Sequence, residues 1–264
     1  MARQAHSQTG PTWRCGGVPG SASHHLLLRP SLITPLIDDK TWLRQLTSLA
    51  PWQPPSQPTL VVAPHPDDET LGAGALIATL RAQGVPVTVV AVTDGENCYD
   101  VPQPERERIR RLREQEQAAA LALLGVPHTS IHRLHLRDSG LHLQEAVLKD
   151  RLAAIAQPGT HLVAPWAGDF HPDHEACARA AAAVAEVGNL SLTSYFFWTW
   201  HRGTEKLLSN VPVRRFLPDS EALRAKTAAL ACHRSQLEWP DGQPILPDNL
   251  LGPARWPFEV FLPA

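Results

Sequence analysis

One stretch, residues 60–74 with the sequence LVVAPHPDDETLGAG, constrains the fold of this chain more than any other. Its first four residues are apolar, as in a buried strand. The apolar run stops at Pro64, and a helix-like spacing of apolar residues then extends from Leu71 to Gly84. The stretch therefore predicts a strand, a tight loop and a helix, the order of elements that builds α/β proteins.

The loop in this stretch carries one imidazole and three carboxylates, from His65, Asp67, Asp68 and Glu69. Packed carboxylates repel one another, and a bound cation is the usual remedy. A proline on each side of His65 restricts its backbone. The nitrogen of His65 and an oxygen of Asp68 suit a divalent transition metal. The alternative is that the acids only cap a helix, but capping leaves the histidine between two prolines unexplained.

Short apolar segments alternate with helical patterns through most of the chain, which favours a parallel sheet with helices on both faces. The predicted fold class is α/β, a Rossmann-like three-layer sandwich with a mostly parallel sheet in a single domain. Further strands are expected at residues 85–92, 129–136, 161–165, 194–200 and 213–217, and helices at 105–124, 144–156, 175–187 and 221–235. The Pro- and Trp-rich remainder is expected to wrap the surface. Residues 1–55 are predicted to be a partly disordered extension with one short helix at 38–49, and residues 56–264 to be the domain.

Composition excludes several classes of protein. A net charge of −2 gives no reason to expect a nucleic acid or an acidic membrane as partner. No apolar run is long enough to cross a bilayer. The four cysteines form no CxxC pair, which favours reduced thiols and a cytoplasmic location. The sequence leaves a homo-oligomer open.

A second loop, His171-Pro-Asp-His174, has the same pattern as the first. It follows a predicted strand, contains a proline and precedes a predicted helix. Ligands of open α/β sheets bind outside the carboxyl ends of the strands, so the two loops are expected to converge. His65, Asp68 and His174 then offer two imidazoles and one carboxylate. Such a set leaves coordination positions open, as in a catalytic metal site.

The remaining polar residues of the two loops have assignable chemistry. Asp67 is expected to take the proton from a metal-bound water as a general base. His171 is expected to stabilise the oxyanion and to protonate the leaving amine. Asp173 is expected to orient His171 through a hydrogen bond. The alternatives are helix caps for the two acids and an exposed loop position for His171.

These residues resemble the PIG-L/LmbE-like deacetylases, through Pro64-His-Pro-Asp-Asp-Glu69 and His171-Pro-Asp-His174. The resemblance extends over residues 60–236. It implies a zinc-dependent enzyme that removes the N-acetyl group from N-acetylglucosamine-type units, with His65, Asp68 and His174 as ligands, Asp67 as general base and His171 as oxyanion stabiliser or general acid. It further implies that Arg113 and Asp138 contact the sugar.

The segment FFWTWHR at residues 196–202 is more aromatic than the resemblance implies. Aromatic rings stack on sugar faces and arginine pairs with anions, so Trp198, His201 and Arg202 are predicted to bind substrate. A buried edge strand explains the segment equally well. The sequence assigns no tyrosine to the site.

The sequence thus predicts a hydrolase that uses Zn²⁺, or another divalent ion such as Fe²⁺, on a small-molecule, lipid or glycoconjugate sugar, releasing acetate and an amine. Four alternatives stay open. The metal site could act on another N-acyl amide, or serve a non-catalytic metal- or sugar-binding protein. Two histidines and a carboxylate also suit an iron(II) oxygenase. Gly72-x-Gly74 is part of a dinucleotide or S-adenosylmethionine motif, but it is incomplete and falls within the predicted helix.

Overall fold

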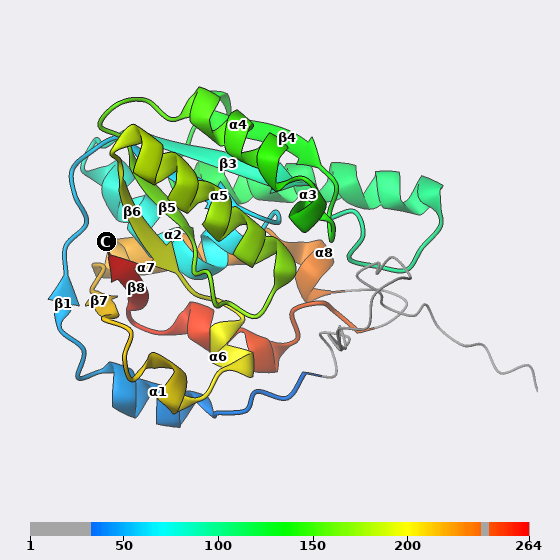
Figure 1. The fold of residues 1–264 in the computed structure, drawn as a ribbon. Coiled ribbons are helices and arrows are strands. Elements are labelled where there is room, and N and C mark those ends of the chain that lie inside the picture. The colour runs from blue at the N-terminus through cyan, green and yellow to red at the C-terminus, as the bar shows by residue number, and fades with distance from the viewer. Residues whose placement is uncertain (1–32, 239–242, 264) are drawn as a thin grey trace, which may run out of the picture.

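A computed structural model describes residues 33–238 and 243–263 of the chain. Its centre is one sheet of eight strands in the order β1-β7-β8-β6-β5-β2-β3-β4 (Figure 1). All neighbouring pairs are parallel except the two that involve β8. The strands are β1 (Pro51–Trp52), β2 (Thr59–Ala63), β3 (Val87–Thr93), β4 (Ile131–Leu136), β5 (His161–Pro165), β6 (Ser191–Tyr195), β7 (Arg214–Phe216) and β8 (Glu259–Pro263).

Helices cover both faces of the sheet, which makes the three layers predicted from the sequence (Figure 1). They are α1 (Asp39–Leu46), α2 (Asp68–Ala82), α3 (Gln103–Leu123), α4 (Glu145–Ile155), α5 (Pro172–Gly188), α6 (Thr199–Arg202), α7 (Ser220–Leu230) and α8 (Arg234–Leu237). Alternate residues of β2 explain the layering, because successive side chains point to opposite faces. Val61 and Ala63 pack into the apolar cluster of α2, α3 and α7, whereas Leu60 and Val62 pack into that of α4 and α5.

The order of the strands reverses beside β2. The chain runs from β2 through β3 to β4 on one side, and then returns to place β5 and β6 on the other side. The loops that follow β2 and β5 therefore leave neighbouring strands at the same edge of the sheet and turn to opposite faces. This reversal is the place where open α/β sheets form a crevice for ligands.

Three predictions for the C-terminal third differ from the structure. Of the strand expected at residues 194–200, only the first two residues are extended, because β6 ends at Tyr195 and α6 begins at Thr199. The remainder after residue 236 is not only a surface wrap, because β8 pairs antiparallel with both β6 and β7 inside the sheet. The helix expected at residues 221–235 is two helices, α7 and α8, separated by a turn at Ala231 and Cys232.

The predicted N-terminal extension falls largely outside the described residues, which begin at 33. Its expected short helix is α1, whose first turn is capped by the Asp38 carboxylate. Trp42 of α1 donates its Nε1 proton to the carbonyl of Trp200 at 3.0 Å, and β1 pairs with β7. The described part of the extension thus packs on the sheet, and the boundary between residues 55 and 56 stays a prediction.

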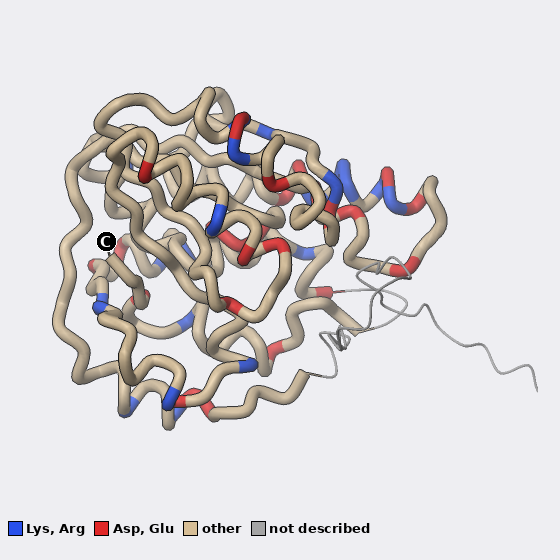
Figure 2. Tube along the Cα trace, viewed as in Figure 1, with Lys and Arg blue, Asp and Glu red and all other residues tan. Residues whose placement is uncertain are grey.

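Charges of both signs are interspersed along the described chain, most visibly on the outer part of α3 (Figure 2). Arg108 pairs with Glu105 at 2.6 Å, and Arg110 pairs with Glu107 at 2.6 Å. These pairs lie one helical turn apart, where opposite charges support a solvent-exposed helix. Within the described residues, no helix is long and apolar enough to cross a membrane.

Candidate active site

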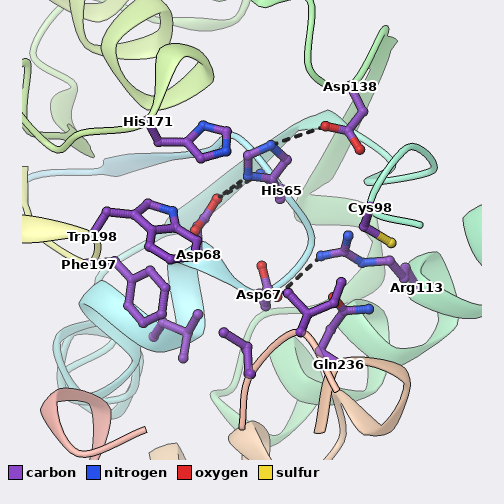
Figure 3. Close-up of a pocket in the computed structure, with 13 residues that line it drawn as sticks. His65, Asp67, Asp68, Cys98, Arg113, Asp138, His171, Phe197, Trp198 and Gln236 are labelled. Carbon is purple, nitrogen blue, oxygen red and sulfur yellow. Dashed lines mark hydrogen bonds and ion pairs between the residues drawn. The ribbon is translucent and has the colours of Figure 1, made fainter. Parts of the chain in front are cut away.

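The two histidine loops meet at the crevice beside β2. His65 lies in the loop after β2, Asp67 is the N-cap residue of α2, and Asp68 begins that helix. His171 is the N-cap residue of α5, and His174 lies in the first turn of the same helix. Figure 3 shows His65, Asp67, Asp68 and His171 around one cavity. The convergence expected from the sequence is therefore present.

His65, Asp68 and His174 bring one potential ligand atom each to within 4.8 Å of one another. The Nδ1 atom of His65 is 3.0 Å from Asp68 Oδ2, and the Nε2 atom of His174 is 3.2 Å from the same oxygen. All three residues lie on the first turns or entry loops of rigid elements. The arrangement matches the set of two imidazoles and one carboxylate that a divalent transition metal prefers.

Two observations show that these residues fit a metal ion. The Nε2 atom of His174 is buried without a hydrogen bond, although it lies near Asp68, as expected for two ligands of one cation. Burial disfavours charge on His174, yet Asp68 and Asp169 raise its pKa to about 9. Burial likewise opposes charge on His65, whose hydrogen bonds to Asp138, Asp173 and Asp68 raise its pKa well above the ordinary value. The carboxylates around His65 and His174 therefore stabilise positive charge between them, and a bound divalent cation would supply that charge.

Asp67 stands apart from the three candidate ligands. Its side chain makes no capping hydrogen bond with α2, so the capping alternative does not describe it. Its Oδ2 atom accepts a hydrogen bond from Arg113 Nη2 at 3.2 Å and faces the cavity (Figure 3). Burial raises the pKa of Asp67 to about 6, although Arg113 acts in the opposite direction. A carboxylate with a pKa near neutrality is suited to accept a proton at physiological pH.

His171 is held as a neutral hydrogen-bond donor. Its Nδ1 atom accepts the backbone N–H of Asp173 at 3.2 Å, which leaves the ring proton on Nε2. Burial and the neighbouring His65 and His174 lower the pKa of His171 to about 3. The Asp173 carboxylate contacts His65 Nε2 at 3.2 Å and accepts the amides of Ser139 and Leu141. Asp173 therefore contacts His171 through its backbone amide and His65 through its carboxylate. The sequence pattern instead predicted that the carboxylate would contact His171.

Arg113 and Asp138 both line the cavity. Arg113 projects from α3 and donates to the carbonyl of Gly95 at 3.0 Å. Gly95 has φ +64, and a Cβ atom there would lie 1.9 Å from Arg113 Nη1, so only glycine admits the guanidinium. Asp138 Oδ1 lies 3.3 Å from His65 Nε2, and its Oδ2 accepts the amide of Asn97 at 2.9 Å.

The aromatic segment contributes Trp198 to the cavity but not His201 or Arg202. Trp198 stacks on His171 with ring centroids 5.9 Å apart. His201 is 1% exposed and packs edge-on against Phe197. Arg202 lies over the Trp198 ring at 4.7 Å and donates to the Phe170 carbonyl. Their roles in binding substrate stay predictions. Neither tyrosine lines the cavity, since Tyr99 donates to the carbonyl of Ser235 and Tyr195 to that of Val62.

Asp169, which follows β5, is a residue that sequence reasoning missed. It is fully buried, and its Oδ2 atom lies 2.8 Å from His174 Nδ1. The same carboxylate accepts the backbone amides of residues 197, 198 and 199 and the hydroxyl of Thr199. One side chain thus orients a candidate ligand and holds the aromatic wall of the cavity. An aspartate at a strand end, five residues before a candidate ligand, was the available signal.

We expect Asp169→Asn to weaken metal binding about 10- to 100-fold, the usual loss when a carboxylate behind a ligating histidine is removed. The amide keeps the size of the carboxylate but offers one oxygen in place of two. Competition with a chromogenic chelator measures the affinity. Asp248→Asn, at a side chain 87% exposed, is the matched control. An unchanged affinity in folded Asp169→Asn would contradict the role.

The cavity also has an apolar lining that the sequence did not indicate. Its lining residues beyond those predicted are Leu71, Cys98, Phe197, Gln236, Ile245 and Leu246. They come from segments far apart in sequence, so no local pattern brings them together. The volume of the cavity is about 60 Å³.

Residues 60–185 match the family model PIG-L, described as GlcNAc-PI de-N-acetylase. A probable N-acetyl-alpha-D-glucosaminyl L-malate deacetylase 2 from Bacillus cereus is 31% identical over 187 residues, which cover 68% of this chain and 83% of the relative. The chain belongs to the PIG-L family. A 1D-myo-inositol 2-acetamido-2-deoxy-alpha-D-glucopyranoside deacetylase from Actinosynnema mirum is also 31% identical, covering 76% of this chain and 93% of that protein.

The fold of this PIG-L family member is shared with a solved structure, N,N'-diacetylchitobiose deacetylase from Pyrococcus horikoshii. The two chains are 23% identical with a TM-score of 0.55, and the match covers 68% of this chain and 70% of the other. At this identity the likeness supports the fold and nothing finer. The α/β fold class predicted from the sequence is confirmed.

Proposed function

We propose that this chain is a metal-dependent hydrolase that removes the N-acyl group of an N-acetylglucosamine-type sugar conjugate. Its PIG-L relatives are named as deacetylases of glucosaminyl malate and of glucopyranosyl inositol. The observation that supports the proposal is the cluster of His65, Asp68 and His174, which lies at a cavity lined by Asp67 and His171. The proposed ion is Zn²⁺, which takes nitrogen and oxygen ligands in catalytic sites with an open position.

A divalent ion held by His65, Asp68 and His174 would lower the pKa of a water molecule and polarise the amide carbonyl. In the proposed mechanism Asp67 takes a proton from the attacking water, and Arg113 keeps the carboxylate oriented. The Nε2 proton of His171 donates a hydrogen bond to the oxygen on which negative charge develops. Asp173 holds that tautomer through its backbone amide.

The bonds balance as an amide hydrolysis. A C–O bond forms between water and the acyl carbon, and the C–N bond breaks. Asp67 returns the abstracted proton to the departing nitrogen, because the neutral His171 has no second ring proton to give. The products are a carboxylate and the free amine of the sugar. Arg113 and Asp138, at the cavity wall near Asp67 and His65, supply charged partners for sugar hydroxyls.

The proposal is tested by measuring the metal content of the purified full-length protein together with amine release from a panel of N-acetylglucosamine conjugates. About one divalent ion per chain with chelator-sensitive amine release is the expected result. Metal without turnover on any conjugate would favour the non-catalytic binding alternative. Activity that requires iron and oxygen would favour an oxygenase.

We expect His174→Ala to lose the bound metal and, with it, turnover, because the variant removes one of three ligands. Metal per chain is measured by elemental analysis after dialysis. His132→Ala, at an exposed histidine of β4, is the control and should keep the wild-type content. Wild-type metal content in folded His174→Ala would overturn the ligand assignment.

A further inference from the structure

The cavity at the proposed site has two walls of opposite chemistry. Arg113 and Asp138 lie on one side of Asp67 and His65, and Phe197 and Trp198 lie on the other (Figure 3). Phe197 and Trp198 belong to one buried apolar cluster whose other cavity-lining members are Leu71, Ile245 and Leu246, and these five residues form the apolar wall. Within the described lining, the acidic and basic side chains are those of His65, Asp67, Asp68, Arg113, Asp138 and His171. The apolar wall therefore carries no charge of its own.

This apolar wall is rigidly built. Leu71 lies one helical turn after Asp68 in α2, so it sits next to a candidate ligand. Phe197 and Trp198 are held through their backbone amides by the buried Asp169. Leu246 donates its amide to the carbonyl of Gln236 at 2.9 Å. The wall thus comes from three segments that are each held by helix or hydrogen-bond contacts.

The direction of the substrate follows from the two walls. Hydrolysis requires the amide carbonyl at the ligand cluster, and the two substituents of the amide then point in different directions. A hydroxylated sugar ring needs polar partners, which Arg113 and Asp138 offer. The acyl group is then directed to the side of Phe197 and Trp198. An acetyl group has only one methyl group beyond its carbonyl carbon. That methyl group can contact only a small part of an apolar wall formed by five residues.

We propose that this chain prefers an unbranched N-acyl group longer than acetyl on its amino sugar. The inference rests on the proposed function and names the substrate class of the same site. The reaction remains amide hydrolysis, in which water supplies the hydroxyl to the acyl carbon and a proton to the nitrogen. It releases a short-chain fatty acid in place of acetate. Each methylene placed against the wall should raise kcat/KM about fourfold, the equivalent of its transfer from water.

The test compares N-acetyl-, N-butanoyl- and N-hexanoylglucosamine, together with an aryl N-acetylglucosaminide, on the metal-loaded full-length protein. We expect kcat/KM for amine release to rise about sixteenfold from acetyl to butanoyl, about fourfold for each of the two added methylenes. A value that falls as the chain lengthens, while acetyl is hydrolysed, would overturn the inference and leave the proposed function standing. A gain limited to the aryl glycoside would place the aglycone at the apolar wall and also overturn it. No amine from any of the four compounds would overturn both.

A matched pair of variants locates the effect. Leu246→Ala shortens a cavity-lining side chain, and Leu251→Ala makes the same change in the same apolar cluster away from the cavity. We expect the ratio of butanoyl to acetyl kcat/KM to fall severalfold in Leu246→Ala and to stay at the wild-type value in Leu251→Ala. Because each ratio is taken within one variant, a loss of folded protein does not change it. Equal ratios in both variants would overturn the assignment of the wall.

Discussion

Asp67→Asn is expected to lower kcat by about 10²- to 10⁴-fold, the range of a general base, while the metal content stays at the wild-type level. The amide has the shape of the carboxylate and still accepts a hydrogen bond from Arg113, but it cannot take a proton. Asp67 lies outside the set of candidate ligands formed by His65, Asp68 and His174, so the ion should remain bound. Steady-state amine release and elemental analysis of the same sample measure the two quantities.

A matched control for this variant is Asp94→Asn. Asp94 is also a buried aspartate at a strand end, after β3, but its carboxylate bonds to His135 at 2.8 Å and does not line the cavity. We expect it to keep wild-type kcat. Full turnover in Asp67→Asn would refute the general-base assignment. Loss of metal in Asp67→Asn would mean that Asp67 acts on the ligand cluster and not only on water.

The convergence of the two loops was predictable from the sequence, because each loop lies next to a strand end. Pro64-His-Pro-Asp-Asp and His171-Pro-Asp-His174 each follow a buried strand, and parallel strands end at the same edge of the sheet. The convergence of the two loops is thus a consequence of local pattern and topology. The contact of the Asp173 carboxylate with His65 was not predictable, because it depends on the relative rotation of α5 and the loop after β2.

The aromatic run SYFFWTW was assigned to a strand because aromatic residues favour strands. The amides of Phe197, Trp198 and Thr199 instead point at one buried carboxylate, that of Asp169. Buried backbone amides need hydrogen-bond acceptors, which a neighbouring strand usually supplies. Here one carboxylate accepts all three amides, so the segment does not have to be a strand. Propensity cannot reveal such a partner, which lies 28 residues or more away in sequence.

The strand β8 escaped prediction for a related reason. Its segment, Glu259–Pro263, begins with an acid and ends with a proline, both uncommon in a central strand. Glu259 is nevertheless 4% exposed and pairs with Lys226 of α7 at 2.7 Å. An acidic residue in a sequence predicts an exposed position, and only the position of its partner in the fold shows that it is buried in an ion pair.

Glu259→Ala is expected to lower the free energy of unfolding by about 3–5 kcal/mol, the cost of leaving one partner of a buried ion pair alone. The carboxylate also accepts the amides of Ala75 and Leu76 at 2.8 Å, beyond the break of α2 at Ala73. Lys226 donates to the carbonyl of Leu71 before that break. The ion pair therefore satisfies both helix ends that the break creates. Urea denaturation followed by circular dichroism measures the loss.

Two further variants distinguish the contribution of the Lys226–Glu259 charges from that of the hydrogen bonds at the break of α2. Glu238→Ala removes a partner of Arg234 from an exposed pair and should change the free energy of unfolding by less than about 1 kcal/mol. The double variant Lys226→Met/Glu259→Gln removes both charges but keeps an oxygen for the amides of α2, so its loss should be smaller than that of Glu259→Ala. If the double variant were as unstable as Glu259→Ala, the α2 amides would require a charged carboxylate as their acceptor. Removing both charges together would then not be enough to preserve stability. Because the first turn of α2 carries Asp68, that result would tie the buried pair to the geometry of the ligand cluster.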